Sequence, residues 1–72
     1  MEAMVEVFKT NVRGKRQARA LLDVLSERFP LFMINFDLED CDKILRVEGE
    51  GIRQDKITEL VTRNGYLCDV LE

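Results

Sequence analysis

The chain has 72 residues, of which 46% are apolar and 35% charged, and it carries a formal net charge of −3. This length suits a single domain over residues 1–72, and the composition is typical of a folded globular protein. The acidic balance argues against nucleic-acid binding, because such domains are usually basic. No segment has the length and apolarity of a membrane span, and the first residues include acids, so we expect a cytoplasmic protein without a signal peptide.

Two elements are predicted in the first part of the chain. Residues 4–10 are rich in Val and Phe and predict a strand that places Val5 and Val7 on one face. Between residues 15 and 29, apolar side chains recur at steps of three and four, which predicts an amphipathic helix. Pro30 should end this helix, because the residue before a proline disfavours helical geometry.

The remaining part of the chain predicts three further strands and a second helix. Apolar and polar residues alternate over residues 31–38, which is typical of a strand, and the acidic segment 39–42 then predicts a reversal. Asn64 and Gly65 supply a left-handed stop after a second helix. The elements expected here are strands at 43–48 and 66–71, and a helix at 54–63, with Tyr66, Cys68 and Val70 facing inward on the last strand.

This order predicts an α+β, ferredoxin-like βαββαβ sandwich: a four-stranded antiparallel sheet with two helices on one face. The other face of the sheet would be open to solvent. We expect it to carry Met4, Glu6, Met33, Asn35, Asp37, Leu67 and Asp69, with Phe8 and Leu71 as further members. Acids repel phosphate and aromatic residues are few on this face, so it does not suit RNA.

The residue types argue against an enzyme and against a cofactor. The chain has no histidine, the commonest general base, and no Gly-rich phosphate loop or serine-elbow motif. Cys41 and Cys68 are far apart without metal-ligand spacing, so they predict reduced thiols and no metal ligands. Cys68 alternates with apolar residues and is expected in the core.

A basic loop follows the first predicted strand. Asn11, Arg13, Gly14, Lys15 and Arg16 lie where backbone N–H groups at a helix N-terminus favour an anion, which predicts a site for phosphate or carboxylate. The alternative is that these side chains are solvated and offset the acidic turn at 37–42, which the expected topology brings to the same end of the sheet.

In outline, the chain resembles the heavy-metal-associated domain of copper chaperones and metal-transporting ATPases. Residues 56–66 look like the second helix and Gly-Tyr turn of that family, and residues 35–39 look like its second strand. The metal motif of that family is a Met-x-Cys-x-x-Cys loop, which falls on residues 10–15 here, and none of these is a cysteine. The resemblance therefore implies a ferredoxin-like relative that has lost its metal site. Small-molecule-sensing ACT domains share the same chain order, with a ligand loop in which Gly14 would fit.

Three functions stay open. The first is a non-catalytic interaction module that self-associates as a homodimer or binds another protein, through Met4, Phe8, Met33 and Leu67 on the open face, or through the nearly uncharged edge strand at 31–38. The second is binding of a small anion or metabolite at the basic loop. The third is residual metal binding through Cys41 or Cys68.

Overall fold

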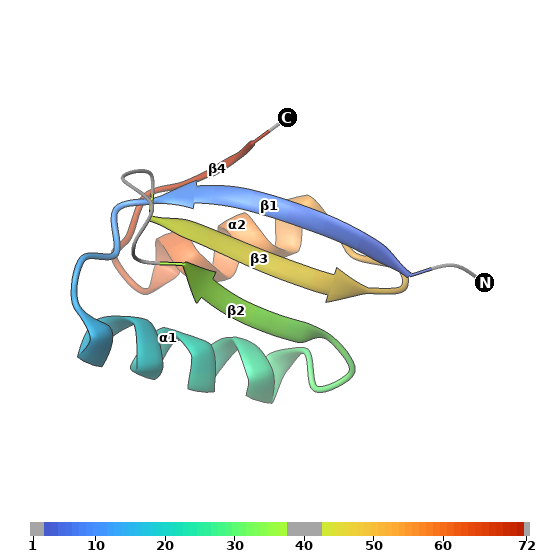
Figure 1. The fold of residues 1–72 in the computed structure, drawn as a ribbon, viewed down its shortest axis with the longest axis horizontal. Coiled ribbons are helices and arrows are strands. Elements are labelled where there is room, and N and C mark those ends of the chain that lie inside the picture. Colours follow the sequence, from blue (N-terminus) through green and yellow to red (C-terminus); the bar gives the residue numbers. More distant parts are fainter. Residues whose placement is uncertain (1–2, 38–42, 72) are drawn as a thin grey trace.

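Two strand–helix–strand units interleave their strands in one antiparallel sheet (Figure 1). The computed structural model describes residues 3–37 and 43–71. Its elements are β1 (Met4–Thr10), α1 (Lys15–Arg28), β2 (Met33–Asp37), β3 (Ile44–Gly49), α2 (Gln54–Arg63) and β4 (Cys68–Val70). The strand order is β2-β3-β1-β4, and every neighbouring pair is antiparallel. These features confirm the predicted ferredoxin-like α+β fold.

Both helices end where local chemistry predicts. The N–H of Phe29 donates to the carbonyl of Leu25 at 2.8 Å and closes the last turn of α1. Pro30 follows and has no N–H to continue the helix, so α1 ends at Arg28, one residue before the expected end. At the end of α2, Gly65 adopts a φ of +93°, a left-handed conformation that glycine reaches without steric cost.

Two strands are shorter than the alternation of apolar residues suggests. β4 covers Cys68–Val70 rather than residues 66–71, because its ladder with β1 joins these residues to the last three residues of β1. β2 covers Met33–Asp37 rather than residues 31–38, and residue 38 lies outside the described residues. A strand is defined by its pairing partners, so apolar periodicity locates it without fixing its ends.

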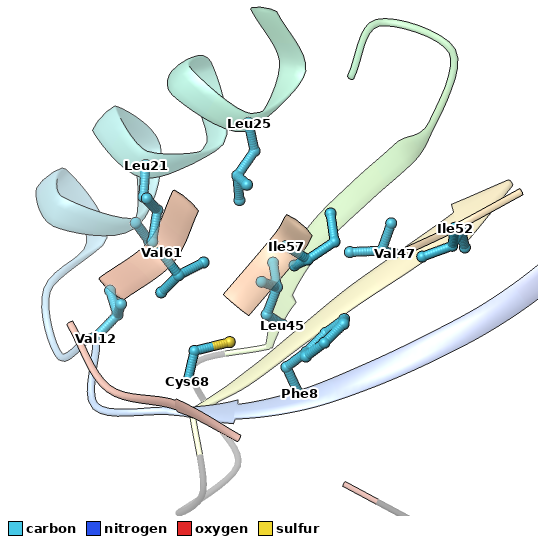
Figure 2. Packing of buried hydrophobic residues seen from close by; sticks show 11 residues of the cluster. Phe8, Val12, Leu21, Leu25, Leu45, Val47, Ile52, Ile57, Val61 and Cys68 are labelled. Carbon is cyan, nitrogen blue, oxygen red and sulfur yellow. The ribbon is translucent and has the colours of Figure 1, made fainter. Parts of the chain in front are cut away.

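The core lies between the sheet and the helices, which both cover the same face (Figure 2). The side chains that are less than 2% exposed come from β1, the loop after β1, α1, β3 and α2: Phe8, Val12, Leu25, Leu45, Val47, Ile57 and Val61. Cys68 from β4 joins this cluster, as expected, and Tyr66 and Val70 pack against it. The inward face predicted for the last strand is therefore confirmed.

The face assignment predicted for β1 is wrong. Phe8, expected on the open face, is fully buried, whereas Val5 is 52% exposed. The cause is the pairing register: Phe8 lies opposite the buried Leu45, and opposite residues in antiparallel strands point to the same side. Because side chains alternate, this register turns Val5 and Val7 towards the open face and the even-numbered residues towards the helices.

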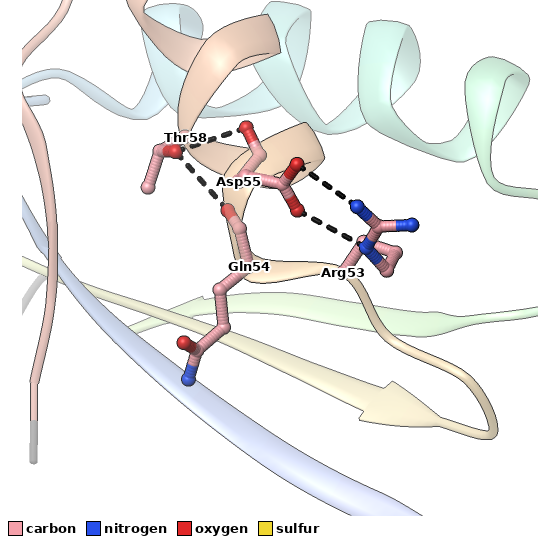
Figure 3. A network of polar contacts seen from close by, with 4 residues as sticks. All are labelled: Arg53, Gln54, Asp55 and Thr58. Atoms are coloured by element: carbon pink, nitrogen blue, oxygen red, sulfur yellow. Dashed lines mark hydrogen bonds and ion pairs between the residues drawn. The ribbon is translucent and has the colours of Figure 1, made fainter.

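Glu6 is the charged member of the helix-facing set of β1. Its carboxylate accepts a hydrogen bond from Nε2 of Gln54 at 2.6 Å, at the first residue of α2. Figure 3 shows Gln54 in this first turn, where Thr58 donates to its carbonyl at 3.1 Å and Arg53 forms an ion pair with Asp55 at 3.3 Å. Glu6 was expected on the open face. It lies instead at the positive end of a helix, where a carboxylate is favoured.

Candidate functional site

The loop between β1 and α1 is held by hydrogen bonds to its own backbone and to the residue before β3. The hydroxyl of Thr10 donates to the carbonyl of Lys43 at 2.7 Å, and the N–H of Val12 donates back to that hydroxyl oxygen at 3.3 Å. Val12 is fully buried in the core. The resemblance drawn from the sequence would place the cysteines of the heavy-metal-associated family on this loop, which supplies a hydroxyl and a valine there. The residues present do not fit a soft metal ion, which needs thiolates.

Two of the five residues expected to bind an anion make intramolecular hydrogen bonds. Oδ1 of Asn11 accepts a bond from the N–H of Leu67 at 2.8 Å, and the N–H of Gly14 donates to Oε1 of Gln17 at 3.4 Å. These bonds attach the loop to the start of β4 and cap the first turn of α1. Both groups are therefore engaged within the chain.

The three basic residues of the predicted anion site, Arg13, Lys15 and Arg16, are solvent-exposed. Lys15 and Asp37 line the same groove, so the basic loop and the end of β2 do meet at one end of the sheet. The other acids expected there, Glu39, Asp40 and Asp42, lie outside the described residues.

Cys68 is a buried thiol with a raised pKa. It is 9% exposed, and burial, together with the charge of Asp69, raises its pKa to about 12. The thiolate, which is the metal-binding form, is therefore disfavoured near neutral pH. Cys41 lies outside the described residues, and among those that are described no group of three or more His, Cys, Asp and Glu side chains is placed to hold a metal.

The sheet face opposite the helices carries exposed apolar side chains. Val5 is 52% and Met33 64% exposed, and both lie opposite Glu48, so these three residues form one row across three strands. The N–H of Leu71 donates to the carbonyl of Val7 at 2.8 Å, which places Leu71 beside Val7 in the next row. Val5, Val7 and Leu71 therefore form a continuous apolar strip.

This arrangement corrects the predicted interface. Met33 and Leu67 are exposed, as expected, and Leu67 precedes β4. Met4 is 49% exposed, but it lies on the helix-facing side of β1, together with Glu6 and Phe8. Phe8 is in the core and cannot contribute. Val5 was missed, since two valines at alternate positions normally indicate the buried face of a strand.

The centre of the open face is charged. Arg46 and Glu48 alternate along β3, and both are exposed. Arg46 lies opposite Val7 on one side and Asn35 on the other. Within residues 3–37 and 43–71, neither Arg46 nor Glu48 has an ion-pair partner. Glu48 therefore lies between the apolar Val5 and Met33, whereas Arg46 lies between Val7 and the polar Asn35.

A groove of about 590 Å³ runs between α1 and β2. Its apolar lining comes from Ala18, Leu22 and Phe36. The polar part of its lining is mostly basic and consists of Lys15, Arg19, Asn35, Asp37 and Arg46. β2 is an edge strand that pairs only with β3, so the groove lies along a free edge of the sheet.

Comparisons of the chain with protein-family models, curated proteins and solved structures give no match. In the described part of the chain, neither helix combines the length and apolarity needed to cross a membrane.

Proposed function

We propose that this chain is a non-catalytic interaction module that self-associates through its open sheet face. The observation that carries this proposal is the set of apolar side chains on a face that neither helix covers, namely Val5, Val7, Met33 and Leu71. The absence of histidine from the sequence supports a non-catalytic role. A domain of this size also buries a small core, so covering this face would add stability.

The pattern of side chains on this face complements itself. Consider a second copy stacked face to face, with a two-fold axis that lies in the interface, perpendicular to the strands, between the rows of Arg46 and Glu48. The two rows are about 7 Å apart along the strands, which is two residues of extended chain. The axis then places each Glu48 over the other copy's Arg46, and each Val5 over the other copy's Val7.

Such a stack would satisfy both charges while it buries the valines. Two-fold interfaces use the same patch on both subunits, so each contact occurs twice. Two sheets packed at the usual distance of about 10 Å leave room for these side chains to interdigitate. Charge complementarity between Arg46 and Glu48 is the reason to choose a second copy as the partner.

Charge reversal at these two positions tests the proposal. Wild-type protein should show a monomer–dimer equilibrium by sedimentation equilibrium. Glu48→Arg places arginine over arginine at both contacts, and Arg46→Glu places glutamate over glutamate. Each variant alone should dimerise about tenfold more weakly or worse, because opposed like charges cost several kcal/mol.

An equimolar mixture of the two variants is the decisive sample. In a mixed dimer one contact pairs the two introduced side chains, a glutamate at position 46 and an arginine at position 48. The other contact pairs the native Arg46 of one copy with the native Glu48 of the other, so both contacts are attractive. The mixture should therefore recover association that neither variant shows.

Two outcomes would count against the proposal. Wild-type protein that stays monomeric at the highest attainable concentration would contradict self-association. A mixture that associates no better than its components would contradict this arrangement of the two faces.

The relationship to the heavy-metal-associated domain and the cytoplasmic location belong to the same proposal. The ferredoxin-like fold and the left-handed Gly65 before Tyr66 support the proposed relationship, in which the chain keeps the scaffold of that family without its metal ligands. The buried free thiol of Cys68 suits a reducing compartment and supports the proposed location.

A further inference from the structure

Two hydrogen bonds elsewhere in the sheet show which backbone groups of β2 point towards its free edge. The N–H of Thr10 donates to the carbonyl of Lys43, and the N–H of Leu71 donates to the carbonyl of Val7. The even-numbered residues of β1 therefore bond to β3, and the odd-numbered ones bond to β4. In an antiparallel sheet the N–H and C=O of one residue point to the same side, and this direction alternates along the strand.

The same alternation, followed from β1 through β3 to β2, shows which backbone N–H and C=O groups of β2 have no partner within the sheet. Phe8 bonds to Leu45 of β3, so Leu45 turns its backbone groups away from β2. Phe36, which lies opposite Leu45, must then turn its own N–H and C=O outward, and so must Ile34, two residues earlier. The free edge of β2 thus offers two N–H donors and two C=O acceptors to an added strand.

The groove beside this edge has the chemistry to select the added strand. Among the described residues that line the groove, Lys15 and Arg19 extend from α1, Arg46 extends from β3, and Asp37 is the one acid. The ion pair of Arg19 with Asp23 is long, at 3.8 Å, and both side chains are more than 70% exposed, so it holds Arg19 weakly. The groove therefore favours negative charge.

We propose that the groove between α1 and β2 binds an extended, acidic segment of another polypeptide, which adds a fifth strand to the sheet beside β2. Backbone hydrogen bonds to Ile34 and Phe36 hold the segment. Its apolar side chains contact Ala18 and Leu22, and its carboxylates reach the basic side chains of the groove. This surface shares Arg46 with the face-to-face dimer, but the backbone groups of the sheet edge and the basic side chains of α1 lie outside the proposed dimer contacts.

The test uses the full chain and two short, terminally blocked peptides, one in which valine alternates with glutamate and one in which valine alternates with lysine. The acidic peptide should shift the amide resonances of Ile34 and Phe36 in nitrogen–proton NMR spectra and slow their hydrogen exchange. The lysine peptide should bind about tenfold more weakly or worse, since its charge opposes that of the groove.

A matched pair of variants separates groove charge from net charge. Lys15→Glu/Arg19→Glu reverses two charges in the groove and should weaken binding of the acidic peptide about tenfold. Lys56→Glu/Arg63→Glu makes the same change of net charge on α2, outside the groove, and should leave binding nearly unchanged. Val5→Lys disrupts the open face and should also leave binding of the acidic peptide unchanged. This variant therefore distinguishes the groove from the interface of the proposed dimer.

Three results would overturn the inference. The first is equal binding of the acidic and lysine peptides. The second is a set of shifts on the open face, at Val5 and Val7, rather than at Ile34 and Phe36. The third is protection of the amides of Ile34 and Phe36 in concentrated protein without peptide, which would assign the edge to pairing between copies of this chain.

Discussion

The ring of Phe32 fills the space that a β-carbon on Gly49 would need. A β-carbon at position 49 would lie 2.5 Å from Cδ1 of Phe32, closer than real atoms approach. The backbone of Gly49 has no positive φ, so packing rather than conformation requires glycine here. The ring also stacks on Phe29, with centroids 5.5 Å apart, and has little freedom to move aside.

Gly49→Ala should therefore destabilise the fold by about 1–3 kcal/mol, the usual cost of overpacking. Urea denaturation measures the change in the free energy of unfolding. The control is the same substitution in a Phe32→Ala background, where the clash is absent and alanine should cost little. An equal loss in both backgrounds would show that Phe32 is not the cause.

The face assignment of β1 predicts losses of stability of different size at Phe8 and Val5. Phe8→Ala should cost about 3–5 kcal/mol, because it empties part of the core. Val5→Ala, on the exposed face, should cost less than about 1 kcal/mol in the monomer, well below a buried truncation. Thermal denaturation of both variants at low concentration checks this. A larger loss of stability for Val5→Ala than for Phe8→Ala would instead indicate that the face carrying Val5 and Val7 is the buried one.

Asn11 should stabilise the chain by tying the loop after β1 to the start of β4. Asn11→Ala removes the acceptor for the N–H of Leu67 and should cost about 0.5–1.5 kcal/mol. Asn11→Asp keeps an acceptor oxygen and should retain most of the stability. Hydrogen exchange at the amide of Leu67 should be faster in the alanine variant only, and equal exchange in both variants would contradict this role.

Gly14 offers a site for stabilisation. It is the N-cap of α1, its backbone is extended, and no side-chain oxygen caps the helix from this position. A β-carbon there would approach nothing closer than 3.8 Å. Gly14→Asp should therefore raise the free energy of unfolding by about 0.5–1 kcal/mol, through a capping bond and attraction to the helix dipole. Gly14→Ala has no acceptor, and it should be no more stable than wild type. An aspartate variant no more stable than the alanine variant would contradict the capping argument.

The buried thiol of Cys68 should make stability fall in alkaline solution. Its pKa is raised from 9.0 to about 12 in the folded protein. Below pH 9 both states keep the proton, whereas between pH 9 and 12 only the unfolded chain releases it. Deprotonation thus favours unfolding, and the stability contributed by the neutral thiol is lost as the pH rises through this range.

The measurement compares Cys41→Ser with Cys41→Ser/Cys68→Ala, so that Cys68 is the one thiol that differs. The free energy of unfolding of the first variant should fall relative to that of the second as the pH increases above 9. The other ionisable groups are the same in both proteins and cancel in the difference. Parallel pH profiles would show that the thiol is not desolvated.

The groove and the charges of the open face could not be found from sequence alone. Arg46 and Glu48 alternate with apolar residues and are recognisable as exposed, but their distance from Val5 and Met33 depends on strand pairing. The sequence predicts a loop site for Lys15 and Arg16 and none for Arg19, because it does not tell which basic residues of α1 lie beside β2. Lys15 and Arg19 reach the groove since α1 packs along that edge.

The order of the elements, the bounds of both helices to within a residue and the inward face of the last strand follow from the sequence, because helical periodicity, Pro30 and Gly65 act on neighbouring residues. Tertiary structure decided which face of β1 is buried. Val5 and Phe8 are both apolar, and a shift of one residue in register exchanges the two faces. Pairing of Phe8 with Leu45, a residue of a distant strand, makes that choice, and it places the valines on the surface through which we propose that two copies meet.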